Sequence, residues 1–234
     1  MTYREVSLCV LGRFQLTIEG CPTSLPVQAQ RLLALLAVRP HQPRSAIAGT
    51  LWGDCSETRA QANLRNAVWL IRRSDESVLS CSRQSVGLDP GLVLDLAEAQ
   101  RSARCVLNGG HADAGLIEAL DQDLLPAWDE EWLIIDRERQ RQLRMHALET
   151  LSETLGRAGR HPEAIAAALA AVRAEPLRES AQRSLIQAHV GEGNLSEAIR
   201  QLESYRLLLD DQLGIAPSNQ LVAIIATALR AQCA

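Results

Sequence analysis

Lysine is absent from this chain of 234 residues, so its 24 basic residues are all arginine. Aromatic residues are also scarce, at 3% of the sequence. Proteins that bind single-stranded nucleic acid without sequence preference stack successive bases on aromatic side chains. The small aromatic content therefore disfavours binding of single strands or RNA by stacking.

Long apolar runs and cysteine motifs are missing as well. No stretch approaches the ~18 consecutive apolar residues of a membrane span, and Met1–Glu5 shows no signal-peptide pattern. The six cysteines form no C-x-x-C pair and do not stand at zinc spacing with histidines. We therefore expect a cytoplasmic protein with reduced structural thiols, no membrane partner, no metal and no cofactor.

The motifs of common enzymes are also missing. There is no G-x-S-x-G, H-E-x-x-H, G-x-G-x-x-G or Walker A sequence, and the five histidines are dispersed. The acids between Asp121 and Glu131 could suggest a metal site. Acids are favoured near a helix N-terminus, so we interpret them as a solvated run. The chain is expected not to be an enzyme.

Charge is unevenly distributed along the chain, whose net charge is −4. Residues 1–94 contain 10 arginines and 7 acids, a net of +3, whereas residues 95–234 contain 14 arginines and 21 acids, a net of −7. A mildly basic N-terminal part with an acidic remainder suits a DNA-binding head on a protein-binding body.

The stretch 58–73 is predicted to form one amphipathic helix. Leu64, Val68 and Ile71 recur at helical spacing and define a stripe that can be buried. The other side carries arginine and asparagine, which can contact guanine and adenine edges through two hydrogen bonds each. The polar residues on or near that side are Arg59, Asn63, Asn66 and Arg73.

Two strand-like runs follow this helix around the polar tip 82–85. A helix with polar side chains followed by a hairpin with a basic tip is the layout of a winged helix-turn-helix. An ordinary surface helix beside an ordinary hairpin is the alternative, because solvated polar helix faces are common. Trp69 and Leu70 project partly toward the same side, and they pack either on the hairpin or on a second protomer.

The residues before that helix complete a small α+β pattern. Strands are predicted at 6–11 and 13–18, a turn at Gly20–Pro22 and a third short strand at Ser24–Val27. A helix over 28–38 follows. A second helix over 46–53 would be capped by Ser45, and the polar loop 54–57 leads to the helix at 58–73.

From about residue 94 the pattern becomes helical. Helices are predicted at 94–107, 114–120 and 129–155. Glu163-Ala164-Ile165 then recurs as Glu197-Ala198-Ile199, and Gly159 recurs as Gly193, at a distance of 34 residues. This period is typical of tetratricopeptide repeats.

Specific segments resemble a known family. The runs LPVQAQRLLALLAVRP, LWGD and ANLRNAVWLIRR resemble the DNA-binding part of the Streptomyces antibiotic regulatory protein (SARP) family. LLPAWDEEWLIIDRERQRQLRMHALETL and ESYRLLLDDQLGIAPS resemble the bacterial transcriptional activator domain that follows it. The predicted fold is mainly α, with a winged helix-turn-helix (α+β) at 1–93 and an all-α, tetratricopeptide-like domain at 94–234.

The resemblance implies a transcriptional activator that binds promoter direct repeats in double-stranded DNA, recruits RNA polymerase holoenzyme and controls a biosynthetic gene cluster. A homodimer, at least on DNA, is expected. Two alternatives stay open: a helical-repeat adaptor whose winged helix contacts protein, and a regulator whose repeats sense a ligand. The expected DNA-contacting residues are Arg59, Asn63, Arg65, Asn66, Arg72, Arg73 and Arg83. The loop expected to contact polymerase is Asp54, Cys55, Ser56 and Glu57.

Overall fold

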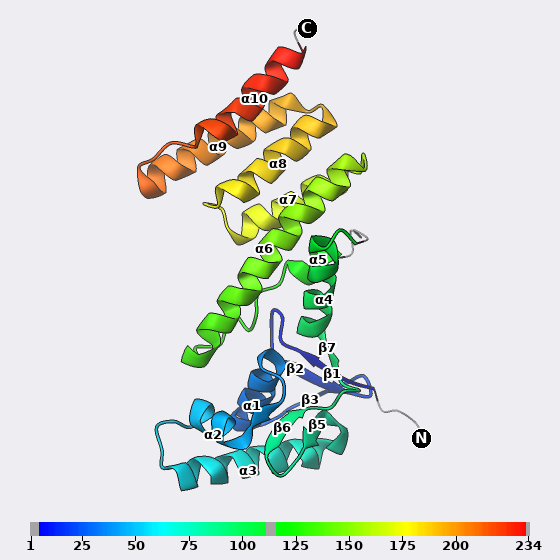
Figure 1. Cartoon of the computed structure of the whole chain (residues 1–234), viewed down its shortest axis with the longest axis vertical. Coiled ribbons are helices and arrows are strands. Elements are labelled where there is room, and N and C mark those ends of the chain that lie inside the picture. The colour runs from blue at the N-terminus through cyan, green and yellow to red at the C-terminus, as the bar shows by residue number, and fades with distance from the viewer. Residues whose placement is uncertain (1–4, 111–115, 233–234) are drawn as a thin grey trace. The chain divides into compact units, whose positions relative to one another are not determined.

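The computed structural model describes residues 5–110 and 116–232, whose elements divide between two compact units (Figure 1). Unit 1 comprises residues 1–100 and 122–140, and unit 2 comprises residues 101–121 and 141–234. The boundary that the sequence places between residues 93 and 94 falls inside unit 1. The segment 122–140 therefore returns to the N-terminal unit after the chain has entered unit 2.

A four-stranded sheet opens unit 1, with strand order β3-β2-β1-β7. β1 (Val6–Cys9) pairs antiparallel with β2 (Gln15–Ile18), and β2 pairs antiparallel with β3 (Cys21–Thr23). β7 (Val93–Leu94) pairs parallel with β1. Because strand side chains alternate between faces, every second residue of β1 faces the core.

The predicted third strand at Ser24–Val27 is wrong. Glu19 and Gly20 both adopt positive φ, so the chain reverses early and β3 occupies Cys21–Thr23, where a turn was expected. Pro26 then stands at the N-cap of α1 (Val27–Val38), which extends over the expected helix. The last residue of the predicted strand therefore belongs to a helix.

Three helices of unit 1 lie next to one another, as Figure 1 shows. α1 and α2 (Arg44–Leu51) both pack against α3 (Glu57–Ser74), which confirms the predicted helix at 58–73. The buried apolar side chains of all three belong to one cluster with the sheet. Ser45 does not cap α2. The helix begins at Arg44, so Ser45 lies inside it, and the N-cap position is occupied by Pro43, which has no side-chain donor or acceptor.

A second sheet follows α3 and a 3-10 turn (η1, Glu76–Val78). β5 (Leu79–Cys81) and β6 (Ser85–Leu88) form an antiparallel hairpin, as the sequence predicts. β4 (Gln42–Pro43) pairs with the other edge of β6, giving the order β4-β6-β5. The short strand before α2 thus ties the hairpin to the helices.

The segment 122–140 completes the unit 1 core. Leu124, Leu125 and Leu133 are buried in the same cluster as α1 and α3. Backbone hydrogen bonds connect Gly12 N–H to Asp123 O at 2.7 Å and Leu125 N–H to Val10 O at 2.9 Å. The acids of this segment also bind α1, because Arg31 Nε lies 2.5 Å from Glu130 Oε1 and Arg39 Nε lies 2.8 Å from Asp136 Oδ2.

The predicted helix at 129–155 begins five residues too early. Residues 129 and 130 precede a 3-10 turn (η2, Glu131–Leu133), and α6 extends over Ile134–Arg157. Arg137 donates through Nε to Leu124 O at 3.0 Å and through Nη2 to Trp128 O at 2.6 Å. These bonds hold the preceding chain in a turn against α6, so it cannot continue the helix.

All regular secondary structure in the described residues of unit 2 is helical. The helices assigned wholly or partly to it are α4 (Asp95–Leu107), α5 (Leu116–Leu120), α6, α7 (His161–Ala174), α8 (Glu179–Glu192), α9 (Leu195–Leu213) and α10 (Asn219–Gln232). The first residues of the helix predicted at 114–120, 114 and 115, lie outside the described residues. Across the two described ranges, no helix combines the length and the apolar character needed to cross a bilayer.

The 34-residue repeat is confirmed. Gly159 and Gly193 both follow a helix with φ near +80°, at 75° and 83°, a conformation that glycine adopts without steric cost. The repeated alanines Ala164 and Ala198 are both fully buried one turn into the next helix. Small buried side chains allow the paired helices to pack closely. The fold is thus mainly α, with a winged helix-turn-helix before helical repeats.

Candidate DNA-binding surface

One side of α3 is committed to the core. Leu64, Ala67 and Ile71 are fully buried, and Val68 is nearly so. Burial of a leucine, valine or isoleucine side chain stabilises a fold by about 1.5–3 kcal/mol. This burial fixes the rotation of the helix about its own axis, and so determines which residues face solvent.

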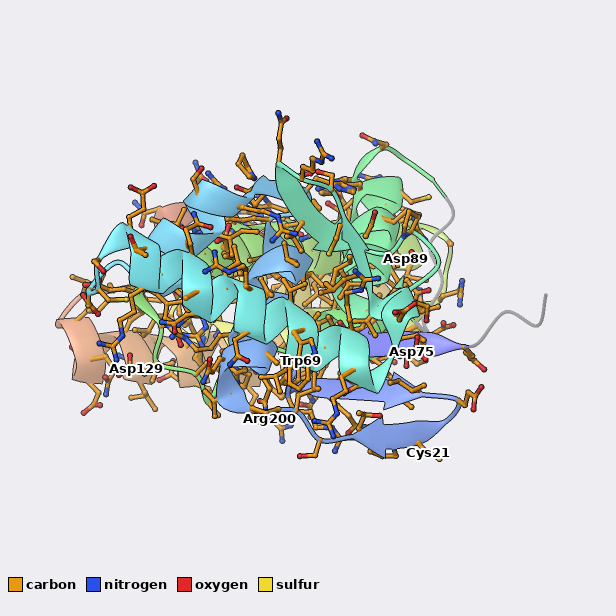
Figure 2. All side chains as sticks on the ribbon, turned by 90° about the horizontal axis from the view of Figure 1, so that it is seen from below. Cys21, Trp69, Asp75, Asp89, Asp129 and Arg200 are labelled. Carbon is orange, nitrogen blue, oxygen red and sulfur yellow. The ribbon has the colours of Figure 1, made fainter. Side chains whose placement is uncertain are left out.

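The exposed side carries a continuous stripe at helical spacing. Arg59, Ala62, Asn66, Trp69 and Arg73 recur at intervals of three and four residues and are all exposed. Figure 2 views unit 1 from below, with α3 across the front, Trp69 on the helix and Asp75 at its end. The structure brings together three of the predicted contact residues, Arg59, Asn66 and Arg73, on this stripe.

Asn63 differs from the other predicted contact residues. It is half-buried, and its Nδ2 lies 4.0 Å from Cys55 Sγ in the loop before α3. Cys55 in turn donates from its thiol to Trp52 O at 3.2 Å. Asn63 therefore stands at the edge of the stripe, where it contacts the loop.

Arg65 and Arg72 flank the stripe on one side and are exposed. Arg72 Nη2 lies 3.7 Å from Glu76 Oε1, a surface pair that stabilises little. Neither guanidinium is buried, so both side chains can extend toward an approaching phosphate.

The hairpin tip is organised by one serine. Ser82 Oγ accepts hydrogen bonds from Ser85 N–H at 2.9 Å and from Gln84 N–H at 3.2 Å, and Ser82 N–H donates to Ser85 O at 3.0 Å. Arg83 is exposed at the outer position of this turn. The turn therefore presents a guanidinium at a defined place, as a wing requires.

Sequence reasoning missed Arg44, which connects the hairpin to the helices. Its Nε donates to Ser82 O at 3.2 Å and its backbone N–H donates to Gln84 O at 2.9 Å. Arg44 is the first residue of α2, so it fixes the tip relative to the helices. The pattern carries no signal for this role, because the two partners are 38 and 40 residues away.

The electrostatics of unit 1 favour this face. Segment 122–140 contains two arginines and six acids, yet its acids Glu130 and Asp136 pair with Arg31 of α1 and with Arg39, the C-cap of α1. Within residues 5–110 and 116–232, Arg59, Arg65 and Arg83 form no ion pair. The acids of segment 122–140 thus pair with arginines at α1, and the guanidinium groups of Arg59, Arg65 and Arg83 are left without an acidic partner among the described residues.

The loop between α2 and α3 is short and largely exposed. Asp54, Ser56 and Glu57 are exposed, whereas Cys55 is half-buried. Ser56 occupies the N-cap position of α3, but its side chain makes no capping hydrogen bond. Removing the polar side chains of this loop therefore removes no observed cap.

Trp69 and Leu70 have different environments. Leu70 is half-buried and packs against the unit 1 core. Trp69 is 54% exposed, and the Arg73 guanidinium carbon lies 5.4 Å from its ring centroid.

In the described part of the chain, no three histidine, cysteine or acidic side chains come together as a metal site.

The comparisons with known proteins agree with this architecture. Residues 107–229 match the bacterial transcriptional activator domain, which is more than half of the chain. The chain therefore belongs to that family, in agreement with the SARP resemblance of its sequence.

Two of those relatives are regulatory proteins named AfsR. The protein from Streptomyces griseus is 28% identical over 224 residues, covering 87% of this chain and 22% of the relative. The protein from Streptomyces coelicolor is 31% identical over 211 residues, covering 81% and 20%. The chain thus spans about a fifth of the length of these relatives.

A solved structure shares the fold. Mycobacterium tuberculosis EmbR, in complex with a low affinity phosphopeptide, superimposes with a TM-score of 0.73 over 97% of this chain and 65% of that chain, at 21% identity. This likeness supports the arrangement of a winged helix followed by helical repeats.

Proposed function

We propose that this chain is a sequence-specific activator that binds double-stranded DNA through α3 and the β5–β6 hairpin. The observation that carries the proposal is the exposed stripe of α3, whose polar side chains stand opposite a fully buried apolar side. A helix held in this way can enter the major groove, where base edges are distinguishable. The DNA contacts are assigned to the winged helix-turn-helix within 1–93, and dimerisation to 94–234.

The residues divide by the chemistry of their side chains. Arg59, Asn66 and Arg73 are assigned to base edges, because they lie on the stripe and can form bidentate hydrogen bonds. Arg65, Arg72 and Arg83 are assigned to phosphates, which position a protein without selecting sequence. Asn63 is assigned to the edge of the interface, next to Cys55.

Activation would require a second contact. The exposed polar loop Asp54–Glu57 is assigned to RNA polymerase holoenzyme, because it makes no capping bond that would explain its polar residues. The SARP resemblance supports binding to promoter direct repeats by a homodimer and control of a biosynthetic gene cluster. Two DNA-binding units on adjacent repeats gain affinity through effective concentration.

The test is a gel shift of the full chain on its own promoter region and on random DNA across a salt series. We expect saturable binding to the promoter. The affinity for random DNA should fall as the salt concentration rises, because that binding depends on phosphate contacts. A triple variant, Arg59→Ala, Asn66→Ala and Arg73→Ala, should lose the preference for the promoter. Equal affinity of the wild-type protein for both DNAs would overturn the proposal.

A helical-repeat adaptor is the second candidate, and one observation favours it. Trp69 exposes 54% of its surface in the middle of the α3 stripe, and exposed aromatic residues are enriched where proteins bind other proteins. In that case α3 would be a protein-binding surface. The same gel shift separates the candidates, since an adaptor would not distinguish the promoter from random DNA.

A further inference from the structure

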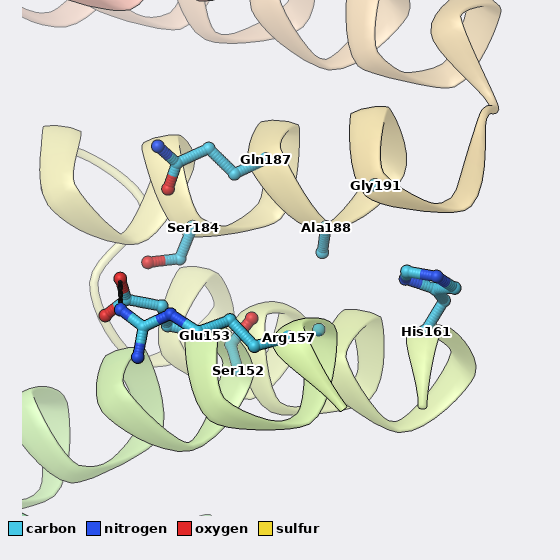
Figure 3. Close-up of a pocket in the computed structure, with 9 residues that line it drawn as sticks. Ser152, Glu153, Arg157, His161, Ser184, Gln187, Ala188 and Gly191 are labelled. Carbon is cyan, nitrogen blue, oxygen red and sulfur yellow. Dashed lines mark hydrogen bonds and ion pairs between the residues drawn. The ribbon is translucent and has the colours of Figure 1, made fainter. Parts of the chain in front are cut away.

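A half-open pocket of about 360 Å³, called the cavity below, lies at the surface of unit 2. It is bounded by α6, the first turn of α7 and α8, as Figure 3 shows. Its polar lining comprises Ser152, Glu153, Arg157, His161, Ser184 and Gln187, and its remaining lining residues are small or partly apolar. The repeats therefore contain a pocket whose lining residues all belong to unit 2 and not to α3.

Ser152 is a buried polar residue without a partner. It is 3% exposed and lines the cavity, and it takes part in none of the hydrogen bonds formed between described residues. Figure 3 shows its hydroxyl directed from α6 toward the space below α8. Because this hydroxyl faces the pocket and bonds to no described residue, it is available to a group that enters the pocket.

His161 supplies a second unpartnered group at the other end. Its Nδ1 is buried and has no hydrogen-bond partner. The ring lies against Gly191 of α8, where an added Cβ would stand 3.5 Å from Nδ1 and 3.5 Å from Cε1. A side chain larger than glycine would therefore narrow this end of the cavity.

Donors and acceptors are both available near Ser152. Ser184 Oγ donates to Ser180 O at 3.1 Å, so its lone pairs remain to accept a hydrogen bond. Arg157 and Glu153 pair across one helical turn, with both side chains more than half exposed. Such surface pairs stabilise little, so a ligand can separate them at small cost. Arg157 and Ser152 can then donate, while Glu153 and Ser184 accept.

We propose that this cavity binds a small zwitterion of the α-amino acid class. The ligand carboxylate accepts hydrogen bonds from Arg157 and Ser152, and its ammonium group donates to Glu153 and Ser184. The ligand side chain extends toward His161, whose unpartnered nitrogen is the site's second specific feature. Pockets for small molecules span roughly 300–1,000 Å³, so a cavity of about 360 Å³ suits an amino acid or dipeptide.

The probe is each of the standard α-amino acids, titrated calorimetrically into the full chain, with the matching N-acetyl amide as a comparison. We expect saturable binding of one or a few amino acids and none of their uncharged derivatives. Ser152→Ala should weaken that binding about ten- to a hundredfold, because it removes a hydrogen bond to a charged group. Ser184→Leu fills the cavity and should abolish binding.

The matched control is Ser204→Leu, an exposed serine of α9 outside the cavity, which should bind as the wild type does. The gel shift is measured on the same preparations. It separates this proposal from the DNA-binding proposal, since either can fail while the other holds. Absence of binding by every amino acid, equal binding of the N-acetyl amides, or unchanged binding by Ser184→Leu would each overturn the assignment.

Discussion

Arg73 lies over the ring of Trp69, with its guanidinium carbon 5.4 Å from the ring centroid. The two residues are separated by one turn of α3 and are both exposed. A cation–π contact at an exposed site is worth about 0.5–1 kcal/mol. That is enough to restrict where the Arg73 guanidinium lies before any partner arrives, and it makes Trp69 a reporter of the α3 surface.

Binding of promoter DNA should therefore change the fluorescence of Trp69. Trp52, Trp128 and Trp132 are only partly exposed and pack against the unit 1 core, so their environment should change little. Titrating DNA into the wild-type protein should alter the emission, and Trp69→Phe should lose most of that change. A full signal in Trp69→Phe would show that DNA does not approach this side of α3.

Asn66→Ala and Arg83→Ala should have different effects on DNA affinity. Asn66 is on the exposed stripe, and its loss should cost roughly 1–3 kcal/mol on the promoter site and little on random DNA. Arg83 is at the hairpin tip, and its loss should weaken both DNAs and reduce the salt slope by about one unit. Affinities of both variants for both DNAs across a salt series provide the measurement.

A matched control for this pair is Arg13→Ala, an exposed arginine of unit 1 outside α3 and the hairpin. It should change neither affinity nor salt slope. If Asn66→Ala weakens random and promoter DNA equally, the assignment of the base-contacting side of α3 is incorrect.

The double variant Asp54→Ala with Glu57→Ala should keep DNA affinity and lose activation. Ser56, which occupies the N-cap position, is retained, and its side chain makes no capping bond in the native protein. We therefore expect no loss approaching the ~1 kcal/mol that a removed cap costs. In vitro transcription beside a gel shift separates the two activities, and a parallel loss of both would contradict the prediction.

Glu179 should contribute to the acid sensitivity of unit 2. Burial raises the pKa of Glu179, but hydrogen bonds from Ser218 and the Arg183 guanidinium outweigh it and hold this pKa below its ordinary value. A lowered folded-state pKa gives stability that is present above about pH 4.3 and lost as pH falls through the folded-state value. Urea unfolding from pH 7 to pH 3 should show a weaker pH dependence for Glu179→Gln, whereas Glu192→Gln, an exposed acid of α8, should follow the wild type.

In a fragment of residues 1–93, the backbone amides of the β1 region should be poorly protected from hydrogen exchange. Asp95 accepts hydrogen bonds from Val10 N–H and Leu11 N–H at 3.0 Å, and Leu124 and Leu125 cover the adjacent core. The fragment lacks all three of these residues. Hydrogen exchange read by mass spectrometry should show faster exchange of residues 6–11 than in the full chain. Equal protection would mean that residues 1–93 fold without the returning segment.

The sequence predicts those features that depend on short-range periodicity. The α3 stripe, the hairpin and the 34-residue repeat all follow from spacings within one or two elements, and all three are present. The start of α6 was not predictable in this way. It depends on Arg137 binding the carbonyl groups of residues 124 to 128 and on ion pairs with α1, about 100 residues away.

Short-range periodicity likewise predicts only part of the candidate site. Arg59, Asn66 and Arg73 share an exposed side because helical geometry alone places them together. Asn63 fits the same spacing but lies against Cys55, a contact set by the loop before α3. Arg44 supports the hairpin through partners that no local pattern connects to it.

The division of unit 1 into two stretches of sequence constrains how the protein is made. Domains generally fold as units during synthesis, with the N-terminal one first, at about 5–20 residues per second. Here the leucines and acids that cover α1 are encoded beyond residue 121, after α4 and α5. The ribosome must therefore release much of the first helices of unit 2 before unit 1 can close its core. Truncated products that end before residue 122 would carry α3 on an incomplete core, so a nascent chain completes unit 1 late in translation.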